Sequence, residues 1–271
     1  MSKSKIALLL SCSSMPAIVN PLDLSGKTVL VTGASSGIGR DACILLSELG
    51  AKVILVARRQ DELVKTLESM TGEGHHYYSF DVTQVRETAA WMKTVAVECG
   101  PIDGIVCAAG ATNTEAIRHL DFDKMDHLMD LNFKASMAMV HAVRQKQVRR
   151  KDGGLSVVLV SSTAGHKGFP GLSIYAATKG AIDAAVRVLA IELARESIRV
   201  NSVVPGLVQT EMVISYEQNV AGKNAVKAGF DLHPLGAGFP RDVSNALAFL
   251  LSDASRWITG TSLVVDGGRL A

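Results

Sequence analysis

The sequence predicts a single α/β domain built on a doubly wound parallel sheet of about seven strands. From Lys27 onward, short apolar segments alternate with longer segments of helical periodicity. The apolar segments are continuous, as in residues 157–160 (VVLV), which is typical of strands buried on both faces of a parallel sheet. No repeat, low-complexity tract or proline-rich linker divides the chain. This alternation therefore predicts one domain with helices on both faces of the sheet.

The elements follow in order along the chain. Apolar runs predict strands at residues 27–32, 51–57, 76–80, 104–108, 155–162, 199–204 and 262–265. Helical spacing predicts a helix over 38–49, which Gly50 ends, and a second helix over 61–70. Longer helical stretches, 125–148 and 175–196, separate the later strands.

Residues 1–22 are expected to form a flexible extension, and residues 23–271 to form the domain. The extension starts MSKSKIALLLSCSS, with two lysines before a short apolar run. That run is shorter than a secretory signal requires, although the signal interpretation stays open. A lipoprotein-like signal is a weaker alternative, because Cys12 comes too early in the chain.

The composition is that of a soluble, cytoplasmic globular protein. Hydrophobic residues make up 48% and charged residues 20%, with a formal net charge of +2, so nothing favours a nucleic-acid or membrane partner. No segment has the 18 or so apolar residues that a membrane span needs. The cysteines are scattered without metal-binding spacing, which predicts reduced thiols and no metal site. They are Cys12, Cys43, Cys99 and Cys107.

A glycine-rich turn follows the first strand, in the sequence VTGASSGIGR. Gly33, Gly37 and Gly39 lie where a doubly wound sheet opens its ligand crevice. Glycines let backbone N–H groups approach a pyrophosphate, and the next helix adds partial positive charge at its N-terminus. The spacing is not the common G-x-G-x-x-G, and a loop without a ligand is the alternative. Its position in a strand–turn–helix–strand unit favours dinucleotide binding.

Further motifs, in order, resemble those of the short-chain dehydrogenase/reductase family. The turn resembles TGxxxGxG, YAATK matches YxxxK, PGLVQT resembles PGxVxT, and ITGTSLVVDGG resembles the closing strand of the compact branch. The resemblance covers about residues 24–268 and implies a Rossmann fold and a nicotinamide cofactor. The cofactor-binding residues that it implies are Gly33, Ser35, Ser36, Gly37, Ile38, Gly39, Arg58, Arg59, Asp81, Val82, Ala108, Ala109, Gly110, Tyr175, Lys179, Pro205, Gly206, Val208 and Thr210.

The end of the second strand selects between the two nicotinamide cofactors. NAD-preferring members carry an acidic residue where this chain has Ala57, and Arg58 and Arg59 follow. A guanidinium fork suits a phosphate monoester, which predicts NADP(H). Arg58 is expected to be the main contact, with Arg59 or Ser35 assisting. Two solvated loop arginines are the alternative.

The predicted catalytic residues are Asn132, Ser162, Tyr175 and Lys179. Tyr175 and Lys179 share one helix face after the fifth strand, and Ser162 lies 13 residues before the tyrosine. A nearby ammonium and a positive nicotinamide ring are expected to lower the tyrosine pKa from about 10, so that Tyr175 acts as general acid/base. Ser162 would hydrogen-bond the substrate oxygen, and the neighbouring Ser161 is a possible misassignment. The family resemblance implies that Asn132 anchors a water relay behind Lys179.

One position departs from the family pattern. The family's NNAG appears here as Cys107-Ala108-Ala109-Gly110, so a cysteine replaces an asparagine that bonds across the central sheet. Because a thiol is a weak donor, some loss of stability is expected, and Cys107 is interpreted as a small core residue.

These features predict an NADP(H)-dependent enzyme that interconverts a small-molecule carbonyl and a secondary alcohol. Reduction of 3-oxoacyl-[acyl-carrier-protein] is one possible reaction, with sugars, steroids and small ketones or alcohols as other substrates. Glu196 stands where such reductases carry a basic docking residue, although Arg149-Arg150-Lys151 could compensate. A non-catalytic nicotinamide sensor or scaffold is the alternative of another class.

Two further regions are expected to contact partners or substrate. The segment 211–236 falls where the family has a mobile lid, and Lys223 and Lys227 there could meet an anion or form a solvated face. Small residues along 175–196 allow close helix packing, and the resemblance implies a homodimer or homotetramer through this face and 125–148.

Overall fold

The computed structural model describes residues 20–150, 153–218 and 222–271. Three sequence predictions fall on other residues. Most of the expected N-terminal extension, with Cys12, lies outside the described residues. So do Lys151 of the basic cluster and residues 219–221 of the expected lid.

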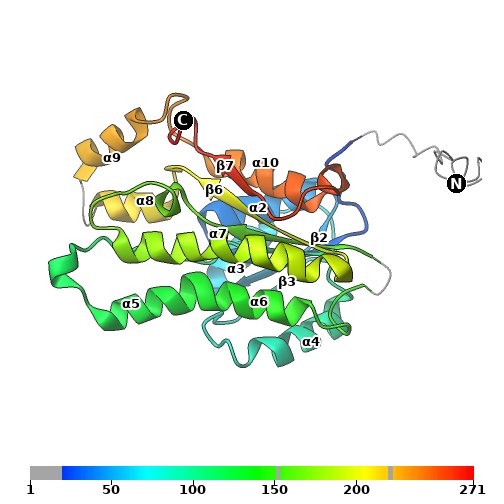
Figure 1. The fold of residues 1–271 in the computed structure, drawn as a ribbon. Helices are drawn as coiled ribbons and strands as arrows, with labels where there is room; N and C mark the ends of the chain where they lie inside the picture. The colour runs from blue at the N-terminus through cyan, green and yellow to red at the C-terminus, as the bar shows by residue number, and fades with distance from the viewer. Residues whose placement is uncertain (1–19, 151–152, 219–221) are drawn as a thin grey trace, which may run out of the picture.

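A seven-stranded, all-parallel sheet forms the centre of the fold, which confirms the predicted class (Figure 1). Its order is β3-β2-β1-β4-β5-β6-β7. The strands are β1 (Thr28–Thr32), β2 (Lys52–Ala57), β3 (His76–Ser79), β4 (Gly104–Cys107), β5 (Leu155–Val160), β6 (Ile198–Pro205) and β7 (Ser262–Val265). The strand order reverses between β1 and β4, and open α/β sheets bind ligands at the carboxyl ends of strands at such a point.

Helices cover both faces of this sheet (Figure 1). One face carries α4 (Thr88–Cys99), α6 (Ala135–Val143) and α7 (Ser173–Leu193), whose apolar side chains share a core cluster. The other face carries α2 (Gly37–Glu48), α3 (Gln60–Glu68) and α10 (Pro240–Leu251) around a second cluster. Central strands such as β1 and β5 are buried on both sides, as their continuous apolar runs predicted, whereas the edge strands β3 and β7 are partly exposed.

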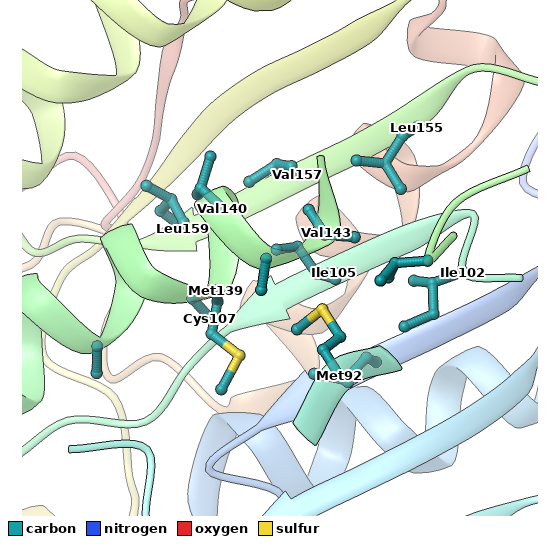
Figure 2. Packing of buried hydrophobic residues seen from close by; sticks show 14 of the residues in the cluster. Met92, Ile102, Ile105, Cys107, Met139, Val140, Val143, Leu155, Val157 and Leu159 are labelled. Atoms are coloured by element: carbon teal, nitrogen blue, oxygen red, sulfur yellow. The ribbon is translucent and has the colours of Figure 1, made fainter. Parts of the chain in front are cut away.

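Figure 2 shows part of the first cluster, where side chains of α6 meet those of β4 and β5. Met139, Ile105 and Leu159 are each almost completely buried there. Burial of a side chain of this size contributes about 1.5–3 kcal/mol to folding. The core therefore fixes the strand ends from which the functional residues project.

The prediction of one continuous helix over 125–148 is wrong. The chain forms α5 (Phe122–Met129), a π-helical turn (Asp130–Lys134) and then α6. Helix α6 ends at Val143, because the following residues turn so that the Val148 carbonyl accepts a hydrogen bond from Ile102. A π turn inside a helix is frequently found at a functional site.

Two other boundaries differ by a few residues. Strand β5 ends at Val160 and not at Ser162, because Ser162 caps the 3₁₀ turn Thr163–Gly165 by accepting a hydrogen bond from the Ala164 N–H. Helix α7 ends at Leu193 and is followed by a 3₁₀ turn, Ala194–Glu196.

The segment after Thr210 contains two short helices, α8 (Glu211–Tyr216) and α9 (Gly222–Asp231). Both lie at the same end of the molecule as the chain's C-terminus (Figure 1). Among the residues described, no helix has the length and apolar character needed to cross a bilayer.

Candidate active site

A cavity of about 660 Å³ opens at the carboxyl ends of the central strands. Every residue predicted to bind the cofactor lines it, from the glycine turn to Thr210, together with Ser162. Asn132 is absent from the lining and lies behind it. Fold and cavity thus bring together predicted cofactor-binding residues that are up to 177 positions apart (Gly33 and Thr210).

The glycine turn packs directly against the end of β4. A Cβ on Gly33, whose φ is +73°, would lie 2.8 Å from the backbone of Ala108, and a Cβ on Gly39 would lie 2.3 Å from the Gly33 carbonyl oxygen. Both positions therefore require glycine. The Thr32 hydroxyl accepts a hydrogen bond from the Ala109 N–H at 3.2 Å, which joins the same two strand ends. This close packing leaves a backbone cradle into which a pyrophosphate fits.

Helix α2 begins at this turn, and a carboxylate is bound to its first N–H. The Gly37 N–H donates to Glu211 Oε2 at 2.9 Å, and Arg40 Nη1 lies 3.4 Å from Glu211 Oε1. Ser36, at the N-cap, makes no capping hydrogen bond with its side chain. Sequence reasoning missed Glu211, because nothing in its local pattern links it to a turn 174 residues earlier.

The arginines after β2 lie at the same turn. Arg59 Nη2 donates to the hydroxyls of both Ser35 and Ser36, each at 3.1 Å. Arg58 also lines the cavity and helps to keep the pKa of Asp81 below its usual value. Burial opposes that shift, and hydrogen bonds from Thr83 provide the larger part of it. Two guanidinium groups and two hydroxyls thus surround one rim of the cavity.

Ser162, Tyr175 and Lys179 come together at the other part of the cavity. Ser162 and Tyr175 are joined by a hydrogen bond between their side chains. Lys179 Nζ lies 5.7 Å from the centre of the Tyr175 ring and donates to the Val160 carbonyl oxygen at 2.8 Å. The helical spacing of four residues and the end of β5 produce this arrangement.

Burial shifts the pKa of both titratable groups. It lowers the pKa of Lys179 to about 8, with Asp183 partly opposing the shift. It raises the pKa of Tyr175, although the Ser162 hydrogen bond acts in the opposite direction. The expectation of a lowered tyrosine pKa is therefore wrong for the chain by itself, because desolvation of the phenolate outweighs the neighbouring groups.

Asn132 is almost fully buried in the π turn. Its side-chain amide accepts from the Ala111 N–H at 2.9 Å and donates to the Ala111 carbonyl at 3.0 Å and to the Thr178 hydroxyl at 3.1 Å. A Cβ on Gly110 would lie 3.1 Å from Asn132 Oδ1 and 3.7 Å from Lys179 Nζ. Asn132 therefore joins the loop after β4 to α7 close behind the lysine.

Ser161 points away from Tyr175 into a buried network that sequence reasoning missed. Its hydroxyl donates to Asp183 Oδ2 at 2.6 Å. Ser202 and Ser262 donate to Asp183 Oδ1 at 2.6 and 3.0 Å, and His166 Nε2 lies 3.0 Å from Oδ2. One carboxylate thus joins α7 to β5, β6 and β7. Because Asp183 follows Lys179 by four residues, helical periodicity could have revealed it.

Cys107, the departure from the family pattern, belongs to the apolar core. It is 4% exposed, and burial raises the pKa of its thiol to about 12, while a hydrogen bond with Ser136 acts in the opposite direction. Figure 2 shows it beside Met139. This environment agrees with its interpretation as a small core residue.

The remaining wall of the cavity is mainly apolar. It comes from the loop before α7, the loop after β6 and the two short helices α8 and α9. His233 connects these parts, because its Nε2 accepts from the Leu207 N–H at 3.0 Å and its Nδ1 donates to the Gly229 carbonyl at 3.0 Å. Arg269, beyond β7, also reaches this wall. Neither residue belongs to a motif in the sequence.

The geometry defines a nicotinamide-dependent oxidoreductase class: a glycine turn at the switch point, with a Ser-Tyr-Lys group beside it. Comparison with known proteins agrees. Residues 33–269 match the family model described as enoyl-(acyl carrier protein) reductase. A 3-oxoacyl-[acyl-carrier-protein] reductase of Vibrio harveyi is 33% identical over 249 residues, which cover 91% of this chain and 98% of that protein.

Other relatives carry different names. The carbonyl reductase family member 4 of Danio rerio is 32% identical over 89% of this chain and 97% of its own. Among solved structures, a putative short-chain alcohol dehydrogenase from Sinorhizobium meliloti matches with a TM-score of 0.85 and 29% identity, covering 93% of this chain and 99% of that chain. A short-chain type dehydrogenase/reductase from Mycobacterium ulcerans matches with a TM-score of 0.83 and 32% identity, covering 92% of this chain and 91% of that chain.

The chain belongs to the short-chain dehydrogenase/reductase family. It is an oxidoreductase that acts on carbonyl and alcohol groups.

Proposed function

We propose that this protein is an NADP(H)-dependent oxidoreductase that interconverts a carbonyl and a secondary alcohol, with Tyr175 as general acid/base. The observation that carries the proposal is the shared cavity. It joins the glycine turn and Arg58 and Arg59 at one part to Ser162, Tyr175 and Lys179 at the other. The intact proton donor argues against a non-catalytic sensor or scaffold, which would need only the first part.

Each side chain has a defined task in the proposed reaction. When bound, the nicotinamide supplies or accepts the hydride. Tyr175 Oη donates a proton to the carbonyl oxygen in reduction and accepts it from the alcohol in oxidation. The Ser162 hydroxyl hydrogen-bonds the same oxygen as negative charge develops there.

Lys179 supports Tyr175 through its charge and its own proton. Its ammonium stabilises the phenolate that forms when Tyr175 gives up its proton. With a pKa near 8, Lys179 can transfer its own proton to the phenolate and so restore the protonated tyrosine. Asn132 holds the loop behind Lys179, and we propose that a water relay starts there.

The support for NADP(H) over NAD(H) comes from the rim after β2. Ala57 offers no carboxylate to the ribose, and Arg58, Arg59, Ser35 and Ser36 offer cations and hydroxyls to a 2′-phosphate. Arg58 is the proposed main contact. Arg59, which is hydrogen-bonded to both serines, shares the phosphate.

A panel of ketones, aldehydes and secondary alcohols tests the reaction through the absorbance of NADPH. Wild-type protein should turn over at least one pair. Tyr175→Phe should reduce kcat by at least about a hundredfold, because the proton donor is lost. Tyr78→Phe, which changes a tyrosine that does not line the cavity, is the matched control. Robust turnover in Tyr175→Phe would contradict the assigned role.

Reduction of 3-oxoacyl-[acyl-carrier-protein] is the second candidate, and the names of several relatives favour it. The surface around Glu196, where such reductases carry a basic docking residue, argues against this candidate. Glu196 binds Arg144 at 2.7 Å and Arg149 at 3.1 Å, so that these arginines are paired within the chain. Comparing a carrier-bound 3-oxoacyl substrate with its short thioester analogue separates the two candidates, since a carrier-dependent enzyme should prefer the former at least about tenfold.

We also propose that residues 23–271 act as the catalytic domain in the cytoplasm and form a homodimer or homotetramer. Apolar side chains on α7 support self-association, since Val188 and Ile191 are 55% and 80% exposed. Sedimentation equilibrium should give a mass of two or four chains, and a monomer at micromolar concentration would contradict it.

A further inference from the structure

The cavity wall furthest from the cofactor rim has one charged side chain, Arg269. Among the described residues lining the cavity, those charged at neutral pH are Arg58, Arg59, Asp81, Lys179, Glu211 and Arg269. The first three lie at the rim after β2 and β3, Glu211 lies on the glycine turn, and Lys179 serves Tyr175. Arg269 follows β7, which is at the opposite edge of the sheet from β2 and β3.

The guanidinium of Arg269 has no carboxylate partner in the described chain. Its Cζ lies 5.4 Å from the centre of the Phe169 ring, and no ion pair to it forms within residues 20–150, 153–218 and 222–271. The nearest acid in the sequence, Asp266, uses its carboxylate oxygens to accept from the N–H groups of Gly268 and Leu270. Lys167 Nζ lies 3.4 Å from the Arg269 carbonyl oxygen, outside the cavity lining.

Thr114 lines the same cavity and packs beside Gly171, in the loop that also carries Phe169. Among the described residues, its hydroxyl is the one buried side-chain polar atom without a hydrogen-bond partner. A buried hydroxyl without a partner is costly. Because this oxygen has almost no accessible surface, a substrate in the cavity does not reach it, and the polar contact on this wall falls to Arg269.

We propose that the substrate is a keto acid or hydroxy acid, with a carboxylate remote from the reacting carbon. Arg269 binds the carboxylate. Apolar side chains of the same cavity, such as Leu172 and Leu232, accommodate the connecting carbon chain. A single guanidinium on an aromatic ring suits one planar, singly charged carboxylate. This proposal rests on the carbonyl–alcohol reaction at Tyr175.

Matched ketones with and without the charge test the proposal. A series of oxo acids of increasing length is assayed with NADPH beside the methyl ester of each acid. For the best chain length, wild-type kcat/KM should favour the acid by at least about tenfold, because a charge-assisted hydrogen bond is lost in the ester. In Arg269→Gln the acid-to-ester ratio should fall to about one. Arg269→Lys should retain an intermediate ratio, since it keeps the charge but not the planar fork.

Two further variants separate binding from structure. Lys167→Gln removes a charge nearby and should keep the acid-to-ester ratio of the wild type. Thr114→Val should raise the melting temperature, because it removes an unsatisfied buried hydroxyl, and should keep the acid-to-ester ratio of the wild type.

The outcomes distinguish this proposal from the proposed function. Turnover with equal kcat/KM for acids and esters, or an unchanged ratio in Arg269→Gln, overturns the carboxylate assignment and leaves the carbonyl–alcohol reaction in place. Absence of turnover across the whole panel, with either nicotinamide cofactor, overturns both. Quenching of bound NADPH fluorescence by the oxo acid in Tyr175→Phe checks binding without turnover, and its loss on adding Arg269→Gln is the expected result.

Discussion

Lys179 is the residue whose environment most affects both chemistry and stability. It is 5% exposed, and burial lowers its pKa to about 8 from 10.5. Between these values the unfolded chain holds a proton that the folded chain has released. The unfolded state therefore binds more protons, so the free energy of unfolding rises with pH across this window. The charged lysine is a cost to folding below pH 8.

A comparison with Lys179→Met should reveal this cost. Between pH 7 and pH 9.5, wild-type protein should gain about 2 kcal/mol of unfolding free energy relative to the variant, by the linkage relation. Urea denaturation at several pH values measures the difference, and Lys134→Met, an exposed lysine paired with Asp130, serves as control. A constant difference across this range would mean that the lysine is not desolvated.

The proposed catalytic tyrosine and serine show which features of the site a sequence motif can predict. The 13-residue spacing and the YxxxK motif selected Ser162 over Ser161, and the structure places Ser162, not Ser161, against Tyr175. The residue pattern did not predict that burial raises the tyrosine pKa in the chain without its cofactor, because desolvation depends on neighbours contributed by the rest of the fold.

Helices α2 and α8 meet at the glycine turn, although five strands and several helices separate them in sequence. Glu211, the first residue of α8, holds the Gly37 N–H at the first residue of α2. This N–H is one that a pyrophosphate would require. A carboxylate there competes with the cofactor for the donor and repels its negative charge.

Glu211→Gln should consequently tighten NADPH binding about three- to tenfold at low ionic strength. The side chain is 54% exposed, so the gain should shrink as salt is added. Fluorescence titration of NADPH at 20 and 300 mM salt measures it. Glu217→Gln removes the same charge further along this segment and should have little effect. Weaker binding in Glu211→Gln would instead make the carboxylate part of the cofactor site.

The secondary structure was predicted well where local signals were strong. Every strand matches its predicted range to within two residues. The signal is strongest in central strands such as β1 and β5, because burial on both faces leaves no polar alternation. The sequence pattern predicts one helix over 125–148, whereas the structure has a π turn at Asp130–Lys134. Its cause is tertiary, namely the contacts of Asn132 with Ala111 and Thr178.

At the scale of the whole molecule, cofactor binding should be visible as stabilisation. A ligand at 100 times its Kd stabilises the folded state by about 2.7 kcal/mol, which shifts the melting temperature of a chain this size by several degrees. NADP⁺ should give a larger shift than NAD⁺ at equal concentration, because it adds the 2′-phosphate contacts.

The arginine variants provide the comparison. In Arg58→Ala and in Arg59→Ala, the melting-temperature shifts with NADP⁺ and NAD⁺ should become more similar. The effect should be largest in the double variant. Arg256→Ala, distant from the cavity, should leave the difference intact. Equal shifts with NAD⁺ and NADP⁺ in wild-type protein would contradict the preference for the phosphorylated cofactor.

The sequence by itself determined the fold class, the family and the reaction chemistry. Strand–helix alternation, the glycine turn and YxxxK are each encoded within a few residues, and each has a local physical reason. The tertiary structure decided what lies around them: Glu211 on the turn, the hydrogen bonds of Asp183 with Ser202 and Ser262, and Arg269 and Thr114 on the cavity wall. Such contacts join positions far apart in the chain. Folding brings them together because the carboxyl ends of all parallel strands meet at one edge of the sheet.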